Sequence, residues 1–365
     1  MLITVLFYIF VVFTGIQILY YLLFSSFLFK SKTVEKSKEK KPISVIVFAK
    51  NNATVLEKNL PLILNQKYPN FEVVVVNSDS DDETTEILEA FYKNHKNLKI
   101  INVENNEAFW GNKKYALTLG IKAAKYDNLL FTDANSSPLS EFWITKMSLQ
   151  FSTQKSIVLG YRKYTKQATL LNLLERFENL LTAIKMFSFA KLNSPIMAFN
   201  NNLAYYRSEF FKVKGFIYHI KIKNGEGDLF LRDAATKENI SYSISKNSFV
   251  KNNAPTSFKE WYNYLVEKNT IKKEYKAKSR FILSFFKLSK TLFYTLGTVL
   301  FFYYPWQILL PIVLSYFVVQ YIIIGISSKK LNEPYLIFFL PFLDIGLLLI
   351  QISIFIANSF SKSNR

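Results

Sequence analysis

The chain has no cysteine and only two histidines, His95 and His219. The lack of cysteine excludes disulfides, thiolate zinc sites and cysteine nucleophiles. Two histidines are too few for a multi-histidine metal centre. Acidic side chains are also scarce, with 27 Asp and Glu against 46 Lys and Arg. Any metal binding or acid–base chemistry must therefore depend on a small set of carboxylates.

Hydrophobic side chains make up 50% of the 365 residues, aromatic ones make up 17%, and the net charge is +19. A disordered chain would have few aromatic residues, so this composition predicts folded structure. A soluble nucleic-acid-binding protein would carry the charge without the hydrophobic excess. The length suggests about two domains.

The first apolar run covers residues 2–29 and contains no charged side chain. At ~1.5 Å per residue it can cross a hydrocarbon core of ~30 Å. A cleaved signal peptide would have its basic residues before the apolar run. Here the basic residues follow it, in 30–41. We therefore expect an uncleaved membrane anchor, with the basic linker on the cytoplasmic side.

Three more apolar runs follow, in residues 281–304, 307–326 and 335–360. They predict four membrane spans in all, with the soluble domain facing the cytoplasm at the inner membrane. Asp344 lies within the last run, where a charge is costly. It marks either a functional site or a hydrogen bond between helices. The basic and aromatic segment 272–290 favours contact with anionic lipid over nucleic-acid binding.

We expect six regions from this pattern. They are an anchor (1–29), a basic linker (30–41), a catalytic domain (42–255), a basic interfacial segment (256–280), three spans (281–360) and a tail (361–365).

The soluble part alternates between short apolar runs and amphipathic segments. Strands are expected at 43–48, 71–76, 98–103 and 128–132, and helices at 54–66, 82–94, 113–124 and 229–235. This alternation predicts an α/β fold whose mostly parallel sheet is covered by helices on both faces. Ligands of such sheets bind at the carboxyl ends of the strands.

Polar clusters follow the predicted strands or sharp turns, at 49–52, 77–82, 132–135 and 224–228. Carboxylate and amide oxygens suit a divalent cation and its phosphate ligands. Asp and Asn are also common turn formers and helix N-caps. The clusters alone leave both interpretations open.

The order of these motifs resembles glycosyltransferase family 2, which has the GT-A nucleotide-sugar fold, and especially its bacterial membrane-anchored members. The segments that carry the resemblance are 44–51, 65–76, 111–121, 130–135, 199–205 and 226–228. Among them are Gln66-Lys-Tyr-Pro-Asn-Phe-Glu72 before the second strand, and Asp133-Ala-Asn135 in the place of the Asp-x-Asp motif.

The resemblance implies inverting transfer of a sugar from a nucleotide-diphosphate donor to an acceptor hydroxyl, in the synthesis of a cell-envelope glycan or glycolipid. It implies Asp228 as the catalytic base, and Asp133 and Asn135 as ligands of a divalent cation, Mg²⁺ or Mn²⁺. The donor-binding residues would be Ala49, Asn51, Ser78, Asp79, Lys113 and Asp133, and the acceptor-side residues Asn202 and Trp261. The other partners would be a lipid-linked or glycan acceptor and membrane lipid, and no nucleic acid is expected.

The chain departs from the family pattern at several positions. Asn77-Ser78 stands where adjacent aspartates are usual, Asn52 replaces a Glu, and Asn135 replaces the second Asp of Asp-x-Asp. The segment after Trp261 lacks the usual Gln and Arg, which favours the addition of a single sugar over processive synthesis. These departures leave open a non-catalytic paralogue that acts as a binding subunit of an envelope-assembly complex. A small transporter is a third alternative, supported only by the spans and Asp344.

Overall fold

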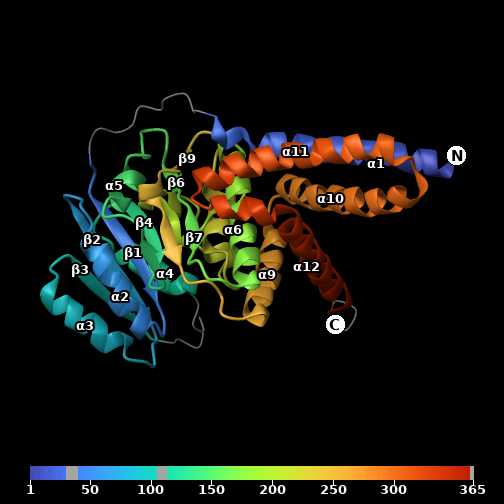
Figure 1. Ribbon diagram of the computed structural model, residues 1–365. Coiled ribbons are helices and arrows are strands. Elements are labelled where there is room, and N and C mark those ends of the chain that lie inside the picture. The colour runs from blue at the N-terminus through green and yellow to red at the C-terminus, as the bar shows by residue number, and fades with distance from the viewer. Residues whose placement is uncertain (30–39, 105–112, 362–365) are drawn as a thin grey trace. The chain divides into compact units, whose positions relative to one another are not determined.

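The computed structural model describes residues 1–29, 40–104 and 113–361. Most of the expected basic linker and the last four residues of the tail lie outside these ranges. The chain forms two compact units. The helical unit comprises Met1–Lys30, Thr169–Ser188 and Tyr275–Arg365, and the α/β unit comprises Ser31–Ala168 and Phe189–Glu274. Figure 1 labels the helices and strands of both units.

The α/β unit contains a seven-stranded sheet in the order β3-β2-β1-β4-β8-β6-β9. Its strands are β1 (Ile43–Ala49), β2 (Phe71–Ser78), β3 (Leu98–Val103), β4 (Asn128–Asp133), β6 (Ile157–Leu159), β8 (Leu203–Tyr206) and β9 (Ile240–Tyr242). Strands β1 to β4 are parallel, as predicted. Strand β8 runs antiparallel to both β4 and β6, so the sheet is mixed.

Helices cover both faces of this sheet, as the apolar strands require. The helices of the unit are α2 (Ala53–Leu64), α3 (Thr84–Asn94), α4 (Lys113–Ala123), α5 (Trp143–Ser148), α7 (Arg207–Lys212), α8 (Glu226–Ala234) and α9 (Phe258–Ile271). Val45 and Val47 pack in one core with Leu56 and Leu60 of α2. On the other face, a Cβ on Gly120 would lie 2.5 Å from Val76, so this glycine lets α4 lie directly on β2.

A second sheet of three short strands was not expected from the sequence. Its order is β5 (Ser136–Pro138), β10 (Val250–Asn252) and β7 (Arg162–Tyr164). Strand β10 pairs antiparallel with β5 and parallel with β7. The segment that follows Asp133 is therefore held against residues more than a hundred positions later in the chain.

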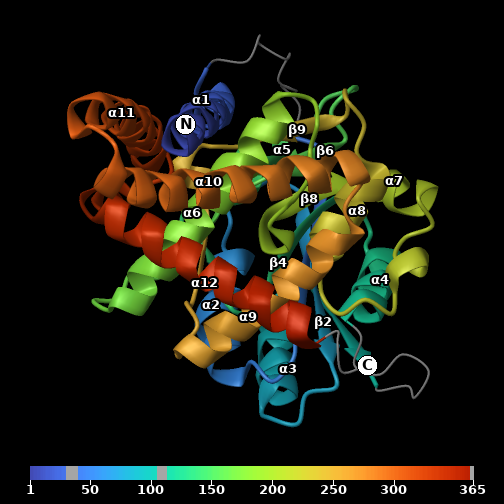
Figure 2. The same ribbon diagram turned by 90° about the vertical axis from the view of Figure 1, so that its right-hand side faces the viewer.

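The helical unit contains α1 (Leu2–Phe24), α10 (Ala277–Tyr303), α11 (Trp306–Lys330), α12 (Leu340–Ser361) and most of α6 (Leu170–Lys191) (Figure 2). Three segments of the described chain are long and apolar enough to cross a membrane: Leu2–Leu28, Trp306–Lys330 and Pro334–Ala357. The remaining predicted span, residues 281–304, forms most of helix α10 but is not among the three. Helix α10 carries Lys278, Arg280, Lys287 and Lys290, which lower its hydropathy.

Buried polar side chains connect the helices of this unit. Lys290 of α10 forms an ion pair with Asp344 of α12, and the Tyr294 hydroxyl donates a hydrogen bond to the same carboxylate over 2.8 Å. Gln17 of α1 donates to the Ser289 hydroxyl over 2.6 Å. Of the two interpretations left open for Asp344, the structure shows the helix–helix hydrogen bond.

Candidate active site

The strand register brings the predicted donor-binding residues to one edge of the main sheet. Ala49, the last residue of β1, pairs with Asn77 of β2. Phe48 pairs with Asp133, the last residue of β4. Because adjacent strands lie about 5 Å apart, the turns after β1, β2 and β4 begin side by side.

The turns after β1 and β2 are hydrogen-bonded to each other. The backbone N–H of Asn51 donates to the Ser80 hydroxyl over 3.0 Å, and the backbone N–H of Asp81 donates to the Asn51 side-chain oxygen over 2.9 Å. Asn51 and Asp79 have positive φ angles of 50° and 47°. Such angles suit Asn and Asp better than bulky residues, which explains the polar composition here. Ser78, the last residue of β2, is buried.

Lys113, the first residue of α4, forms an ion pair with Asp133. Its ammonium lies 2.6 Å from Oδ1 of Asp133 and 4.8 Å from the centre of the Phe48 ring. Burial lowers the pKa of Lys113, but the carboxylates of Asp133 and Glu226 outweigh this effect and leave the pKa above its ordinary value. Lys113 is therefore a fixed cation at the carboxyl edge. The sequence predicted both residues but not their ion pair.

Asp133 and Asn135 provide a small set of oxygen donors for the implied divalent cation. Mg²⁺ is often bound by one or two carboxylates together with substrate phosphates. The side-chain oxygen of Asn135 accepts a hydrogen bond from the Asn252 amide over 3.2 Å and lies 3.5 Å from the Ser136 hydroxyl. The described residues contain no group of three or more His, Cys, Asp or Glu that could hold a metal ion. The donor set thus fits a cation held weakly by Asp133 and completed by phosphate oxygens.

The second sheet connects Asn135 to the predicted acceptor side. Asn252 accepts a hydrogen bond from the Ser136 hydroxyl over 2.8 Å, and Asn201 donates to that hydroxyl over 3.2 Å. Asn201 belongs to the 3₁₀ turn η2 (Asn200–Asn202). This network places the turn beside the segment that follows Asp133.

Asn202 is fully buried, and its amide is occupied by protein groups. It donates to the carbonyls of Tyr161 and Ser248, each over 2.8 Å, and accepts from the indole N–H of Trp143 over 3.0 Å. Asn202 would therefore affect an acceptor indirectly, by fixing the position of η2. Trp261 is also fully buried in α9, and its indole N–H has no hydrogen-bond partner within the described chain.

Helix α8 places two carboxylates in its first turn, Glu226 and Asp228. The helix begins after Gly225, whose φ of 76° is strained for other residues. Asp228 Oδ1 accepts a hydrogen bond from the backbone N–H of Ala198 over 2.8 Å. A Cβ on Gly227 would lie 3.3 Å from the Cα of Asn200. The turn therefore packs directly against η2, which brings α8 to the same network.

Glu226 was not predicted as a site residue. Its side chain is buried, at 5% exposure, and Oε1 has no hydrogen-bond partner within the described chain. Its charge acts on both Lys113 and Lys114. A buried carboxylate oxygen without a partner is costly, so this arrangement points to a functional role. In the sequence, Glu226 belongs to the polar cluster 224–228 and to the segment 226–228 that carries the family resemblance, but the resemblance implied Asp228 as the base.

Lys114 holds the segment that leads into α8. The side chain is completely buried, and its ammonium donates to the carbonyls of Ile222 and Asn224, the latter over 2.6 Å. Burial lowers the pKa of Lys114, and the Glu226 carboxylate offsets part of this effect. The adjacent residues Lys113 and Lys114 thus fix β4 and the approach to α8, respectively.

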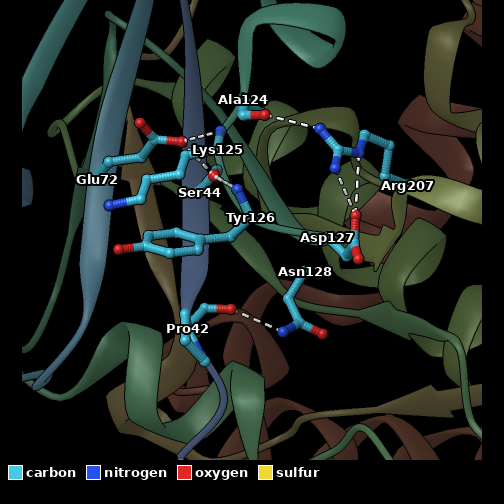
Figure 3. Close-up of polar contacts among 9 residues, drawn as sticks. All are labelled: Pro42, Ser44, Glu72, Ala124, Lys125, Tyr126, Asp127, Asn128 and Arg207. Atoms are coloured by element: carbon cyan, nitrogen blue, oxygen red, sulfur yellow. Dashed lines mark hydrogen bonds and ion pairs between the residues drawn. The ribbon is translucent and has the colours of Figure 1, made fainter.

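The opposite edge of the sheet has a different character (Figure 3). Glu72 Oε1 accepts hydrogen bonds from the Ser44 hydroxyl and the Lys125 backbone N–H, each over 2.5 Å. Arg207 forms an ion pair with Asp127 at 2.6 Å. An open hollow of about 680 Å³ lies at this edge and includes Lys41, Lys125 and Phe211 in its lining. These polar groups satisfy one another, and ligands of parallel sheets bind at the carboxyl edge instead.

Comparison with known proteins agrees with the fold. Residues 44–220 match the family model of Glycosyl transferase family 2. Poly-beta-1,6-N-acetyl-D-glucosamine synthase of Staphylococcus epidermidis is 27% identical over 159 residues, which are 40% of this chain and 37% of that protein. An uncharacterized glycosyltransferase of Haemophilus influenzae is 33% identical over 105 residues, which are 29% of this chain and 31% of that protein. The chain thus spans about a third of the length of these curated relatives.

Among solved structures, the mannosyltransferase PcManGT from Pyrobaculum calidifontis, in complex with GDP-Man and Mn²⁺, superposes with a TM-score of 0.60. The alignment covers 95% of this chain and 99% of that one at 15% identity, so it shows a shared fold alone. The resemblance found in the sequence is confirmed by the family match. Residues 44–220 form a glycosyltransferase family 2 domain with the GT-A fold, in a chain whose helices are long and apolar enough to span a membrane.

Proposed function

We propose that the chain is a membrane-bound inverting glycosyltransferase that moves a sugar from a nucleotide-diphosphate donor to an acceptor hydroxyl. The observation that carries the proposal is the arrangement at the carboxyl edge. A lysine–aspartate pair, Lys113 and Asp133, lies within electrostatic reach of a buried carboxylate, Glu226, that has an oxygen without a partner in the described chain. Glycosyl transfer needs both parts: positive charge for the departing diphosphate and a base for the acceptor hydroxyl.

The donor diphosphate would lie against Lys113 and Asp133. A divalent cation held by Asp133 and Asn135 would neutralise the charge that develops on the diphosphate as it leaves. Lys113 supplies a further positive charge beside the same carboxylate. The turns that carry Ala49, Asn51, Ser78 and Asp79 would hold the nucleoside.

The base would come from the first turn of α8. The sequence predicted Asp228, which accepts a hydrogen bond from the Ala198 backbone and so supports η2. We infer that Glu226 removes the proton, because its Oε1 is free of protein partners within the described residues. Asp228 would then position the turn that faces the acceptor, near Asn202. The helix N-terminus favours negative charge on both side chains.

The setting would be the cytoplasmic face of the inner membrane, with a lipid-linked or glycan acceptor of the cell envelope. Three segments long and apolar enough to cross a membrane support attachment to it. Lys329 and Lys330, at the end of α11, support the orientation through the positive-inside rule. A relative named for poly-beta-1,6-N-acetyl-D-glucosamine synthesis supports an envelope glycan. A single added sugar is the expected product, since the segment after Trp261 lacks the usual Gln and Arg.

The test uses the purified full chain in lipid nanodiscs with UDP- and GDP-sugars. Donor binding is measured by calorimetry, and nucleotide release is measured with an envelope lipid extract as the acceptor source. We expect Glu226→Gln to slow release by about a hundredfold or more with little change in donor affinity. Asp127→Asn, at the opposite edge, is the matched control and should keep full turnover.

The variant Asp228→Asn separates the two carboxylates. If it abolishes turnover while Glu226→Gln remains active, the base is Asp228 as the sequence predicted. If neither variant changes the rate of a measurable reaction, the assignment of α8 to catalysis is wrong.

A binding subunit without catalysis is the second candidate, favoured by one observation. Asp133 is already paired with Lys113, and the Asn135 oxygen accepts from Asn252, so both predicted metal ligands have protein partners. This function predicts donor or glycan binding that Mn²⁺ does not strengthen, with no nucleotide release. Donor binding that strengthens with Mn²⁺, together with turnover, would exclude it.

A further inference from the structure

Exposed hydrophobic side chains of the α/β unit are concentrated in one short segment. Nine large hydrophobic residues are exposed in its described part, and three of them lie within eight positions: Phe211, Ile217 and Tyr218. Their exposed fractions are 48%, 68% and 69%. Single exposed hydrophobic residues are normal on protein surfaces, whereas a local concentration with a polar rim often marks a contact surface.

The backbone fixes these side chains in outward positions. Phe210, Phe216 and His219, which alternate with them in sequence, are buried. The Phe210 and Phe216 rings pack edge to face at 5.0 Å, and the Phe216 and His219 rings lie 5.7 Å apart. Positive φ angles at Lys214 and Gly215 turn the chain between α7 and the 3₁₀ turn η3 (Ile217–His219). The exposed residues therefore belong to an ordered surface.

Cations surround the exposed hydrophobic residues. Lys212, Lys214 and Lys221 are all exposed, and the Lys214 ammonium lies 5.9 Å from the centre of the Tyr218 ring. The single acidic residue between 207 and 223 is Glu209, which accepts a hydrogen bond from Ser156 over 2.8 Å. Phe211 also lines the hollow that contains Lys41 and Lys125. The surface is thus continuous with more positive charge.

We propose that residues 211–221 form a docking surface for the headgroup layer of an anionic phospholipid bilayer. Aromatic and aliphatic side chains flanked by lysines are the combination that binds at a lipid interface. Each lysine near an anionic surface contributes several-fold, so three together amount to on the order of a hundredfold in surface affinity. This inference rests on the proposed membrane attachment: helices that are long and apolar enough to span a membrane would tether the α/β unit and raise the effective concentration of lipid at this surface.

The absence of cysteine makes a direct test practical. Single-cysteine variants Ile217→Cys and Tyr92→Cys are labelled with an environment-sensitive fluorophore. Tyr92, on α3, is the matched control because it is an aromatic residue with 58% exposure. The full chain is placed in nanodiscs at one copy per disc, with and without phosphatidylglycerol, and spin-labelled lipid is added as the quencher.

In discs with phosphatidylglycerol we expect several-fold stronger quenching at position 217 than at 92. The charge reversals Lys212→Glu, Lys214→Glu and Lys221→Glu together should remove this difference. Quenching at 217 no stronger than at 92 would overturn the proposal. So would a label at 217 that is shielded from water but not quenched by lipid, since a protein surface such as a second copy would then cover it. Neither readout depends on catalysis.

Discussion

The buried ion pair between Lys290 and Asp344 gives a prediction whose magnitude follows from its surroundings. The side chain of Lys290 is 8% exposed and that of Asp344 is fully buried. Removing one partner of such a pair leaves an uncompensated charge and costs about 3–5 kcal/mol, whereas neutral replacement of both partners costs little. We therefore expect Asp344→Asn to destabilise the helical unit by about 3 kcal/mol or more. The double variant Lys290→Met/Asp344→Asn should recover most of that loss.

The substitutions are chosen to isolate the charge. The Asp344→Asn change keeps a side-chain oxygen that can accept the hydrogen bond from the Tyr294 hydroxyl. The control Tyr294→Phe removes that hydrogen bond alone and should cost about 1 kcal/mol. Each kcal/mol corresponds to about 2–4 °C for a unit of this size, so the single variant should melt about 6–12 °C below the wild type. Tryptophan fluorescence during heating in detergent micelles measures these shifts.

One result would refute the reasoning. If the double variant melts as low as Asp344→Asn, the loss comes from packing and not from the unpaired Lys290 charge. A confirmed pair would show how α10 can lie in a membrane although its composition does not select it as a span. Lys290 lowers the hydropathy of α10, but it would not stand as an isolated charge next to lipid.

Three further predictions concern the α/β unit. Gly227→Ala should lower turnover and cost about 1 kcal/mol, seen as a lower melting temperature, because its Cβ would lie 3.3 Å from a backbone atom of Asn200. Lys114→Met leaves two partly buried carbonyls without their donor, so we expect a loss of about 2 kcal/mol in thermal unfolding and a lower kcat. Burial lowers the pKa of His219 from 6.5 to about 4, against the opposing effect of Asp233 and with added repulsion from Lys114 and Arg232. As the pH falls, His219 is therefore protonated in the unfolded chain before it is protonated in the folded protein. The free energy of unfolding should fall by up to about 3 kcal/mol between pH 6.5 and pH 4. In His219→Phe the melting temperature should vary less over this range.

The strand–helix alternation of residues 43–133 could be predicted because each strand is a short, mainly apolar segment between polar turns. Strands buried on both faces, such as Val73–Val76 of β2, have a signal that is independent of the rest of the chain. The second sheet has no such signal. Its strands are three residues long, and Ser136–Pro138 is an ordinary turn composition. It forms only because residues from three distant segments meet there.

Some residues of the candidate site could likewise be predicted from the sequence, and others could not. Asp133 and Lys113 could be identified from local motifs, since each lies at the end of a predicted strand or helix. The preference for Glu226 over Asp228 could not, because both are acidic residues in one turn. The difference lies in tertiary contacts: Asp228 binds the Ala198 backbone, and Glu226 Oε1 has no partner in the described part of the chain.

The scarcity of acidic residues acquires a physical meaning at the site. Asp133 is paired with Lys113, and the charge of Glu226 is offset by Lys113 and Lys114, so these two carboxylates already have positive charge beside them in the structure. A diphosphate brings additional negative charge, which two isolated carboxylates would repel. The Lys113 ammonium has three N–H donors, so it can keep its ion pair with Asp133 and also bind a phosphate oxygen from its present position. On the proposed mechanism, the lysines would thus allow a negatively charged donor to approach the edge that also carries the base.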